Sequence, residues 1–117
     1  MATAAPAESV GLYKGLEQRR SKRIHRPIRL MILGQDLEGR PYREKMPTVS
    51  LSFHGCSFLS WHNSQIGAKV ELQLAEGLVN QSPLRASVRY VRPPMRHGGL
   101  FQIGVEFYAP HGEWLSP

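Results

Sequence analysis

The stretch that decides the fold is LFQIGVEF, residues 100–107, near the end of the chain. Large apolar residues occupy every second position in it: Phe101, Ile103, Val105 and Phe107. A period of two is typical of a strand that buries one face and exposes the other. We therefore predict a half-buried β-strand here. A glycine in the middle of such a strand allows a bend or the close approach of a neighbour.

Five earlier stretches have a strand-like pattern, and Gly- or Pro-rich turns separate several of them. They lie at residues 28–33, 42–50, 56–59, 67–74 and 84–91, with GQDLEG at 34–39 as the first predicted turn. Pro47 interrupts the second stretch, which favours an edge strand or a bulge. Helical periodicity fits nowhere for long. Short strands at regular spacing predict an all-β barrel or sandwich.

The stretch at 84–91, LRASVRYV, alternates as cleanly as the last one. Its predicted core face carries Leu84, Ala86, Val88 and Tyr90. The opposite face is basic, with Arg85 and Arg89 in the stretch and Arg92 just after it. Since charged strand faces usually meet water, we interpret these arginines as a solvated surface.

The bulk composition limits the classes of function. The chain has 117 residues and a formal net charge of +6, from 15 Lys and Arg against nine acidic residues. One domain is expected at this length, and the excess positive charge favours an anionic partner. The single cysteine, Cys56, cannot form an intrachain disulfide. That fits a reducing compartment, and neither a membrane span nor a secretory signal is evident, so we expect a cytoplasmic protein.

No pattern in the chain indicates an enzyme, a metal site or a cofactor. Its five histidines lack metal-ligand spacing. They are His25, His54, His62, His97 and His111. Cys56 lies two residues after one of them, but without an evident third partner we interpret it as a small buried hydrophobe. Neither a Walker A loop nor a GxGxxG motif is present.

The positive charge gathers near the start of the chain. Residues 1–15 are small and polar, and we predict a disordered tail there. Seven of the fifteen basic residues follow between positions 14 and 29, four of them in RRSKR at 19–23. We expect one domain over residues 16–110 and a short tail over 111–117.

Two motifs together resemble the PilZ family, whose members bind the bacterial messenger cyclic diguanylate. The family pattern is RxxxR, then a first strand, then (D/N)xSxxG. The corresponding residues are Arg19, Arg20 and Arg23 in RRSKR, and Ser50, Ser52 and Gly55 in SLSFHG. RPIRL after the first motif and IGVEF near the end also fit, so the resemblance covers roughly residues 17–109. Ser50 departs from the pattern, which has Asp or Asn there.

The resemblance implies a six-stranded antiparallel β-barrel with a flexible N-terminal segment and little or no C-terminal helix. It also implies a receptor that orders its arginine-rich segment over the barrel when cyclic diguanylate binds. Such an adaptor signals to a downstream protein, still to be identified, in motility, exopolysaccharide or biofilm control. No further cofactor is implied.

The residue types suit this ligand independently of the resemblance. Arginine can bond phosphate oxygens or guanine O6 and N7 with its planar fork, and it stacks on purines. Ser50 and Ser52 are two apart on a strand and would share a face. A serine hydroxyl cannot accept from guanine N1–H and N2–H together as a carboxylate does. Gly55 would allow a positive φ or a close ligand approach.

Two alternatives stay open. The domain could be a degenerate PilZ module that binds only proteins, with Ser50 as the mark of the lost site. It could also be a small basic barrel that binds single-stranded nucleic acid, although its aromatic residues, Tyr42, Phe53, Trp61 and Tyr108, are scattered. More simply, Arg19 to Arg23 could be a solvated tail, and Ser52 and Gly55 could only shape a turn.

Overall fold

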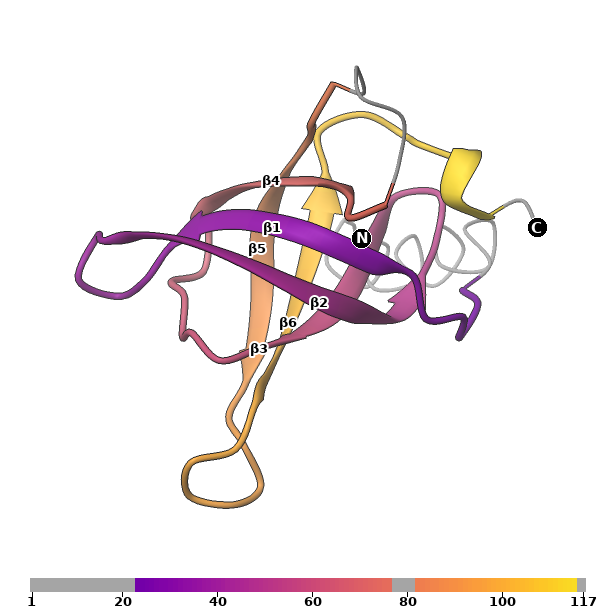
Figure 1. Ribbon diagram of the computed structural model, residues 1–117. Coiled ribbons are helices and arrows are strands. Elements are labelled where there is room, and N and C mark those ends of the chain that lie inside the picture. The colour runs from indigo at the N-terminus through magenta and orange to yellow at the C-terminus, as the bar shows by residue number, and fades with distance from the viewer. Residues whose placement is uncertain (1–22, 77–81, 116–117) are drawn as a thin grey trace, which may run out of the picture.

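The computed structural model describes residues 23–76 and 82–115. In this part of the chain, six antiparallel strands form a closed barrel in the order β1-β2-β3-β6-β5-β4 (Figure 1). The strands are β1 (Arg29–Gln35), β2 (Pro41–Leu51), β3 (Gly55–Ser60), β4 (Lys69–Leu74), β5 (Leu84–Arg92) and β6 (Phe101–Phe107). The expected all-β class and the six-stranded antiparallel barrel are both confirmed.

The strand ends differ from the predicted ones by a few residues, and the first turn shows why. The turn expected at 34–39 is shorter, because β1 continues to Gln35. One Asp36 carboxylate oxygen accepts hydrogen bonds from the backbone N–H groups of Glu38 and Arg40, each at 2.9 Å. The Arg40 N–H contributes most to lowering the Asp36 pKa. An Asx turn of this kind closes the hairpin locally.

The barrel interior is filled by the inward side chains that the alternation predicts. The fully buried large residues include Leu30, Ile32, Phe58, Leu72, Val88 and Ile103. A one-turn 3-10 helix, η1 (Glu113–Leu115), adds Trp114 to this core. The Trp114 ring meets the ring of Phe107 edge-on at 6.0 Å between centroids. The sequence pattern predicts only a short tail over residues 111–117, and it does not indicate that Trp114 packs in the core.

Two bulges shift the register where β2 and β5 carry outward side chains. One lies between Thr48 and Ser50, just after the proline that indicated an edge or a bulge. The other lies between Val88 and Tyr90, so that Tyr90 pairs with Gly104. The prediction that Tyr90 shares the core face of Val88 is therefore wrong. After the bulge the alternation of inward and outward side chains is shifted by one residue, so Val91 packs against the core in place of Tyr90.

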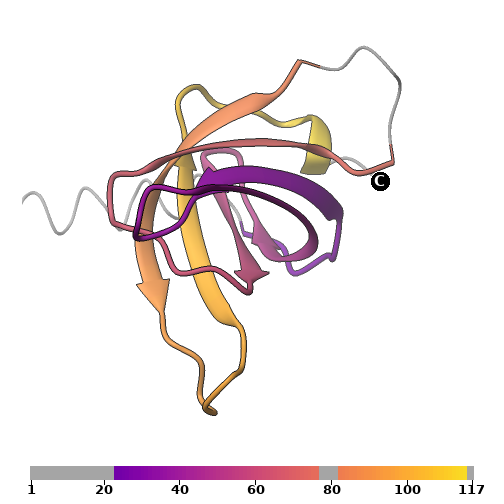
Figure 2. The same ribbon diagram turned by 60° about the vertical axis from the view of Figure 1, so that its left-hand side comes forward.

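The β5–β6 hairpin extends away from the rest of the barrel, as two views show (Figures 1 and 2). In the described ranges, no helix is long and apolar enough to cross a membrane.

Candidate functional site

The outer face of β2, β3, β6 and β5 has a floor of small residues. Ser50 pairs with Ser57, Ser57 with Gly104, and Gly104 with Tyr90, in one row across the four strands. In this row only Tyr90 is large, and it lies at the β5 edge. A Cβ built on Gly104 would lie 1.9 Å from the Tyr90 ring. Gly104 thus has the close neighbour that the sequence indicated, and that neighbour is an outward tyrosine.

The first motif reaches the second at Ser50. The Arg23 guanidinium donates a hydrogen bond to the Ser50 hydroxyl at 2.9 Å. The Ser50 hydroxyl also shares a hydrogen bond of 2.8 Å with the Ser57 hydroxyl. Ser50 is only 4% exposed. The next residue after Arg23 is tied to β2, since Ile24 and Leu51 exchange two backbone hydrogen bonds of 2.8 Å. Arg23 is therefore anchored at one edge of the floor.

The other two motif arginines, Arg19 and Arg20, lie outside the described residues. The structure thus brings together the remaining four residues that the motifs single out: Arg23, Ser50, Ser52 and Gly55.

Ser52 and Gly55 shape the turn between β2 and β3. The Ser52 hydroxyl donates to the Gly55 carbonyl at 3.1 Å and accepts from the backbone N–H groups of His54 and Gly55 at 3.3 and 3.2 Å. Gly55 does not have the positive φ that sequence analysis considered. A Cβ there would lie 2.3 Å from the Val105 carbonyl oxygen, so the glycine is needed for close approach of β6. Both residues build the rim of the site.

A cavity of about 840 Å³ covers this floor. Besides the motif residues, its lining includes Arg89, Tyr90, Arg92, Gln102, Gly104 and Glu106. The cavity is therefore bounded by β2 and the segment of Arg23 on one side and by β5 on the other.

The β5 edge of the cavity carries positive charge as well. The Arg92 guanidinium lies over the Tyr90 ring, 5.2 Å from its centroid, in a cation–π contact. Arg89 forms an ion pair with Glu106 at 3.2 Å. Arg89 and Arg92 are exposed, as the interpretation of a solvated face expects, and both also line the cavity. The sequence places both arginines outward, but it does not predict the cavity, because the cavity also needs the β5 bulge that turns Tyr90 outward over Gly104.

Cys56 lies beneath this surface and has no place in its chemistry. The residue is 2% exposed and belongs to the core. Burial raises the pKa of its thiol to about 12, against a smaller opposing effect of the Arg23 charge. A protonated thiol is a poor nucleophile, which agrees with its interpretation as a small buried hydrophobe. Within residues 23–76 and 82–115, no group of three or more His, Cys, Asp or Glu residues is placed to hold a metal ion.

The barrel with its outer cavity defines a small binding module, and comparison with known proteins gives its family. The family model of the PilZ domain matches residues 17–113. Since the match covers most of the chain, the protein belongs to the PilZ domain family.

A solved structure, the K. pneumonia MrkH-c-di-GMP complex, has the same fold with a TM-score of 0.56 and 19% sequence identity. The alignment covers 80% of this chain and 46% of that one, so the matched region spans less than half the length of the MrkH chain. A search of curated proteins found no match.

Proposed function

We propose that this protein is a receptor for cyclic diguanylate that acts as an adaptor and not as a catalyst. The observation that carries the proposal is the hydrogen bond between Arg23 and Ser50, because it joins the two PilZ motifs over one cavity. Membership of the family supports the proposal, as does the likeness in fold to a structure that is titled as a complex with this nucleotide.

The chemistry of the cavity suits a flat ligand with two negative charges. The cavity over the small residues leaves room for planar bases beside the Tyr90 ring, which itself lies against Gly104. Arg23 at one edge and Arg92 at the other supply two separated cations for the two phosphates. The Tyr90–Arg92 pair adds a surface on which a guanine can stack. Ser50 and Ser52, which both line the cavity, carry hydroxyls that can bond a base or ribose.

Arg19 and Arg20 complete the proposed site from the segment that precedes Arg23. Binding orders this segment over the cavity and changes the surface shown to a downstream protein, which is a disorder-to-order switch. The proposed domain starts near residue 16, after a tail of residues 1–15. We place its C-terminal end at residue 110, and the packing of Trp114 in the core supports an extension to residue 115. The lone cysteine and the ligand fit a cytoplasmic receptor.

The test is isothermal titration calorimetry with cyclic diguanylate, using the wild type and Arg23→Ala. We expect saturable binding that is weaker by about 1.5–3 kcal/mol in the variant, the worth of a hydrogen bond to a charged group. Arg85→Ala is the matched control, since Arg85 is an exposed β5 arginine that does not line the cavity. Unchanged affinity in Arg23→Ala would refute the assigned site.

Ser50→Asp tests the departure from the family pattern. The carboxylate accepts from guanine N1–H and N2–H together, so we expect tighter binding. Unchanged affinity would show that Ser50 is not a limiting contact. Absence of heat with the wild type, at concentrations that detect a complex near −8 kcal/mol, would favour the degenerate, protein-binding module instead.

Salt separates the nucleotide from single-stranded nucleic acid, the other ligand that the basic charge allows. Nucleic-acid affinity falls steeply with salt because counterions are released along the strand. A dinucleotide that is held by stacking and directional hydrogen bonds should lose less affinity over the same range.

A further inference from the structure

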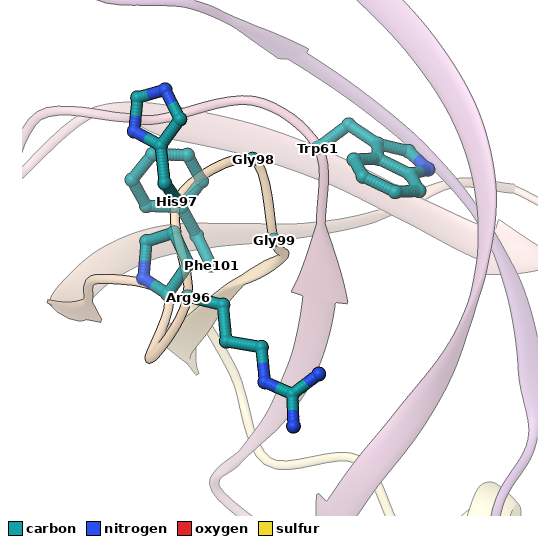
Figure 3. Close-up of a pocket in the computed structure, with 7 residues that line it drawn as sticks. Trp61, Arg96, His97, Gly98, Gly99 and Phe101 are labelled. Carbon is teal, nitrogen blue, oxygen red and sulfur yellow. The ribbon is translucent and has the colours of Figure 1, made fainter.

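A second cavity, of about 490 Å³, lies at the tip of the β5–β6 hairpin. Trp61, just after β3, is in its lining, and Gly98 and Gly99 lie between Trp61 and His97 in the view of Figure 3. Phe101, the first residue of β6, is also in its lining. Because Phe101 pairs with Ser60, the last residue of β3, this hairpin cavity is at the end of β3 and β6, two of the four strands under the larger cavity, which is called the nucleotide cavity below.

The apolar side chains around the hairpin cavity are unusually exposed. Trp61 is 61% exposed. Met95 is fully exposed and lies between two lining residues, Pro94 and Arg96. Tryptophan is enriched among the residues that contribute most to binding at protein interfaces. An exposed indole does not stabilise the core, so a role in binding explains the position of Trp61 better than packing does.

The hairpin tip is held in shape without a ligand. The Gly99 N–H donates to the Arg96 carbonyl at 2.9 Å, which closes a tight turn. Gly98 takes a φ of 81°, which favours glycine. A Cβ on Gly99 would crowd the Arg96 carbonyl oxygen at 3.1 Å and Pro94 at 3.2 Å. A preformed cavity reduces the ordering cost of binding.

The charge of the cavity is positive and lacks an internal partner. Among the described residues, no side chain forms a hydrogen bond or ion pair with the Arg96 guanidinium, and His97 lies beside it in the lining. The Glu44 carboxylate is near Trp61 but does not line the cavity. It accepts hydrogen bonds from the Ser60 hydroxyl and, at 3.4 Å, from the Trp61 backbone N–H. An anionic group in the cavity could therefore pair with the Arg96 guanidinium, and the exposed Trp61 indole belongs to the same lining.

We propose that the hairpin cavity docks a short acidic segment of a partner protein, with an apolar side chain against Trp61 and a carboxylate on Arg96. Single-stranded nucleic acid would need cations spread along a groove. An anionic membrane is typically bound by clusters of several lysines and arginines. Here the charge is confined to Arg96 at one preformed cavity, which suits one carboxylate beside an apolar anchor.

The test is selection of displayed random peptides on the full chain, followed by fluorescence anisotropy with the selected peptides. We expect peptides that combine Asp or Glu with a large apolar residue. Trp61→Ala and Arg96→Glu should each weaken their binding by at least about tenfold, as loss of a central interface residue does. Ile66→Ala and Arg85→Glu are matched controls, since both residues are exposed and neither lines the cavity.

Three results would overturn the proposal. The first is selection that yields no acidic and apolar consensus. The second is peptide affinity that survives both Trp61→Ala and Arg96→Glu. The third is binding to a single-stranded oligonucleotide or to phosphatidylserine vesicles that depends on Arg96 while peptides do not bind.

Calorimetry with cyclic diguanylate on the same variants separates this proposal from the nucleotide receptor. Trp61 and Arg96 do not line the nucleotide cavity, so both variants should bind the nucleotide as the wild type does. Failure of the peptide test would leave that result unchanged, and failure of nucleotide binding would leave the peptide test valid.

Discussion

The two faces of β3 and β6 differ in the size of their side chains. Inward, Phe58 pairs with Ile103, and both are fully buried in the barrel. Outward, the neighbouring pair is Ser57 with Gly104. Ser57 is fully buried beside Ser50, and Gly104 lies against the Tyr90 ring, so the small residues here are required by the side chains of the outer face and not by the barrel interior. The comparison teaches that one face of the strands maintains the fold and that the other leaves room for a ligand.

The largest expected effect is on the inward face. Phe58→Ala should lower the free energy of unfolding by about 3–5 kcal/mol, because it removes buried surface and leaves a cavity. Urea denaturation measures the change, with Leu59→Ala on the same strand as a less buried control. A loss for Phe58→Ala below about 1 kcal/mol would show that the barrel does not depend on this face.

A smaller effect is expected where the outward face is tightest. Gly104→Ala puts a Cβ against the Tyr90 ring, so we expect a loss of about 1–3 kcal/mol in the free energy of unfolding from overpacking. The double variant Gly104→Ala/Tyr90→Ala removes the overlap. A double-mutant cycle should therefore give a coupling energy between the two positions that arises from this overlap. If the two changes in the free energy of unfolding were simply additive, the contact would be contradicted.

The smallest effect on stability is expected at the cavity edge. Arg89 and Glu106 form an exposed ion pair, so Arg89→Ala should change the free energy of unfolding by less than about 1 kcal/mol. Its affinity for cyclic diguanylate should nevertheless fall, since a cation is removed from the lining. Urea denaturation and calorimetry on one preparation compare the two quantities, with Arg85→Ala as control. A large loss of stability with unchanged affinity would reverse the role assigned to Arg89.

Much of the fold could be predicted because strand periodicity is local. The alternation in residues 100–107 correctly placed Ile103 and Val105 in the core. Strand ends were less predictable, since hydrogen bonds such as those of the Asp36 carboxylate decide them. The second motif is identified by its resemblance to the PilZ pattern, and the structure brings Ser50 beside Arg23.

The sequence by itself determined the strands, their alternating faces, the excess positive charge and the two motifs, because each is a property of neighbouring residues. Only the tertiary structure decided that Tyr90 turns outward, that Arg89 and Arg92 line a cavity, and that Trp114 packs in the core. The physical reason is that a bulge, a register and a packed ring depend on partners distant in the chain. For Tyr90 the partner is Gly104, the one position of β6 that leaves room for its ring.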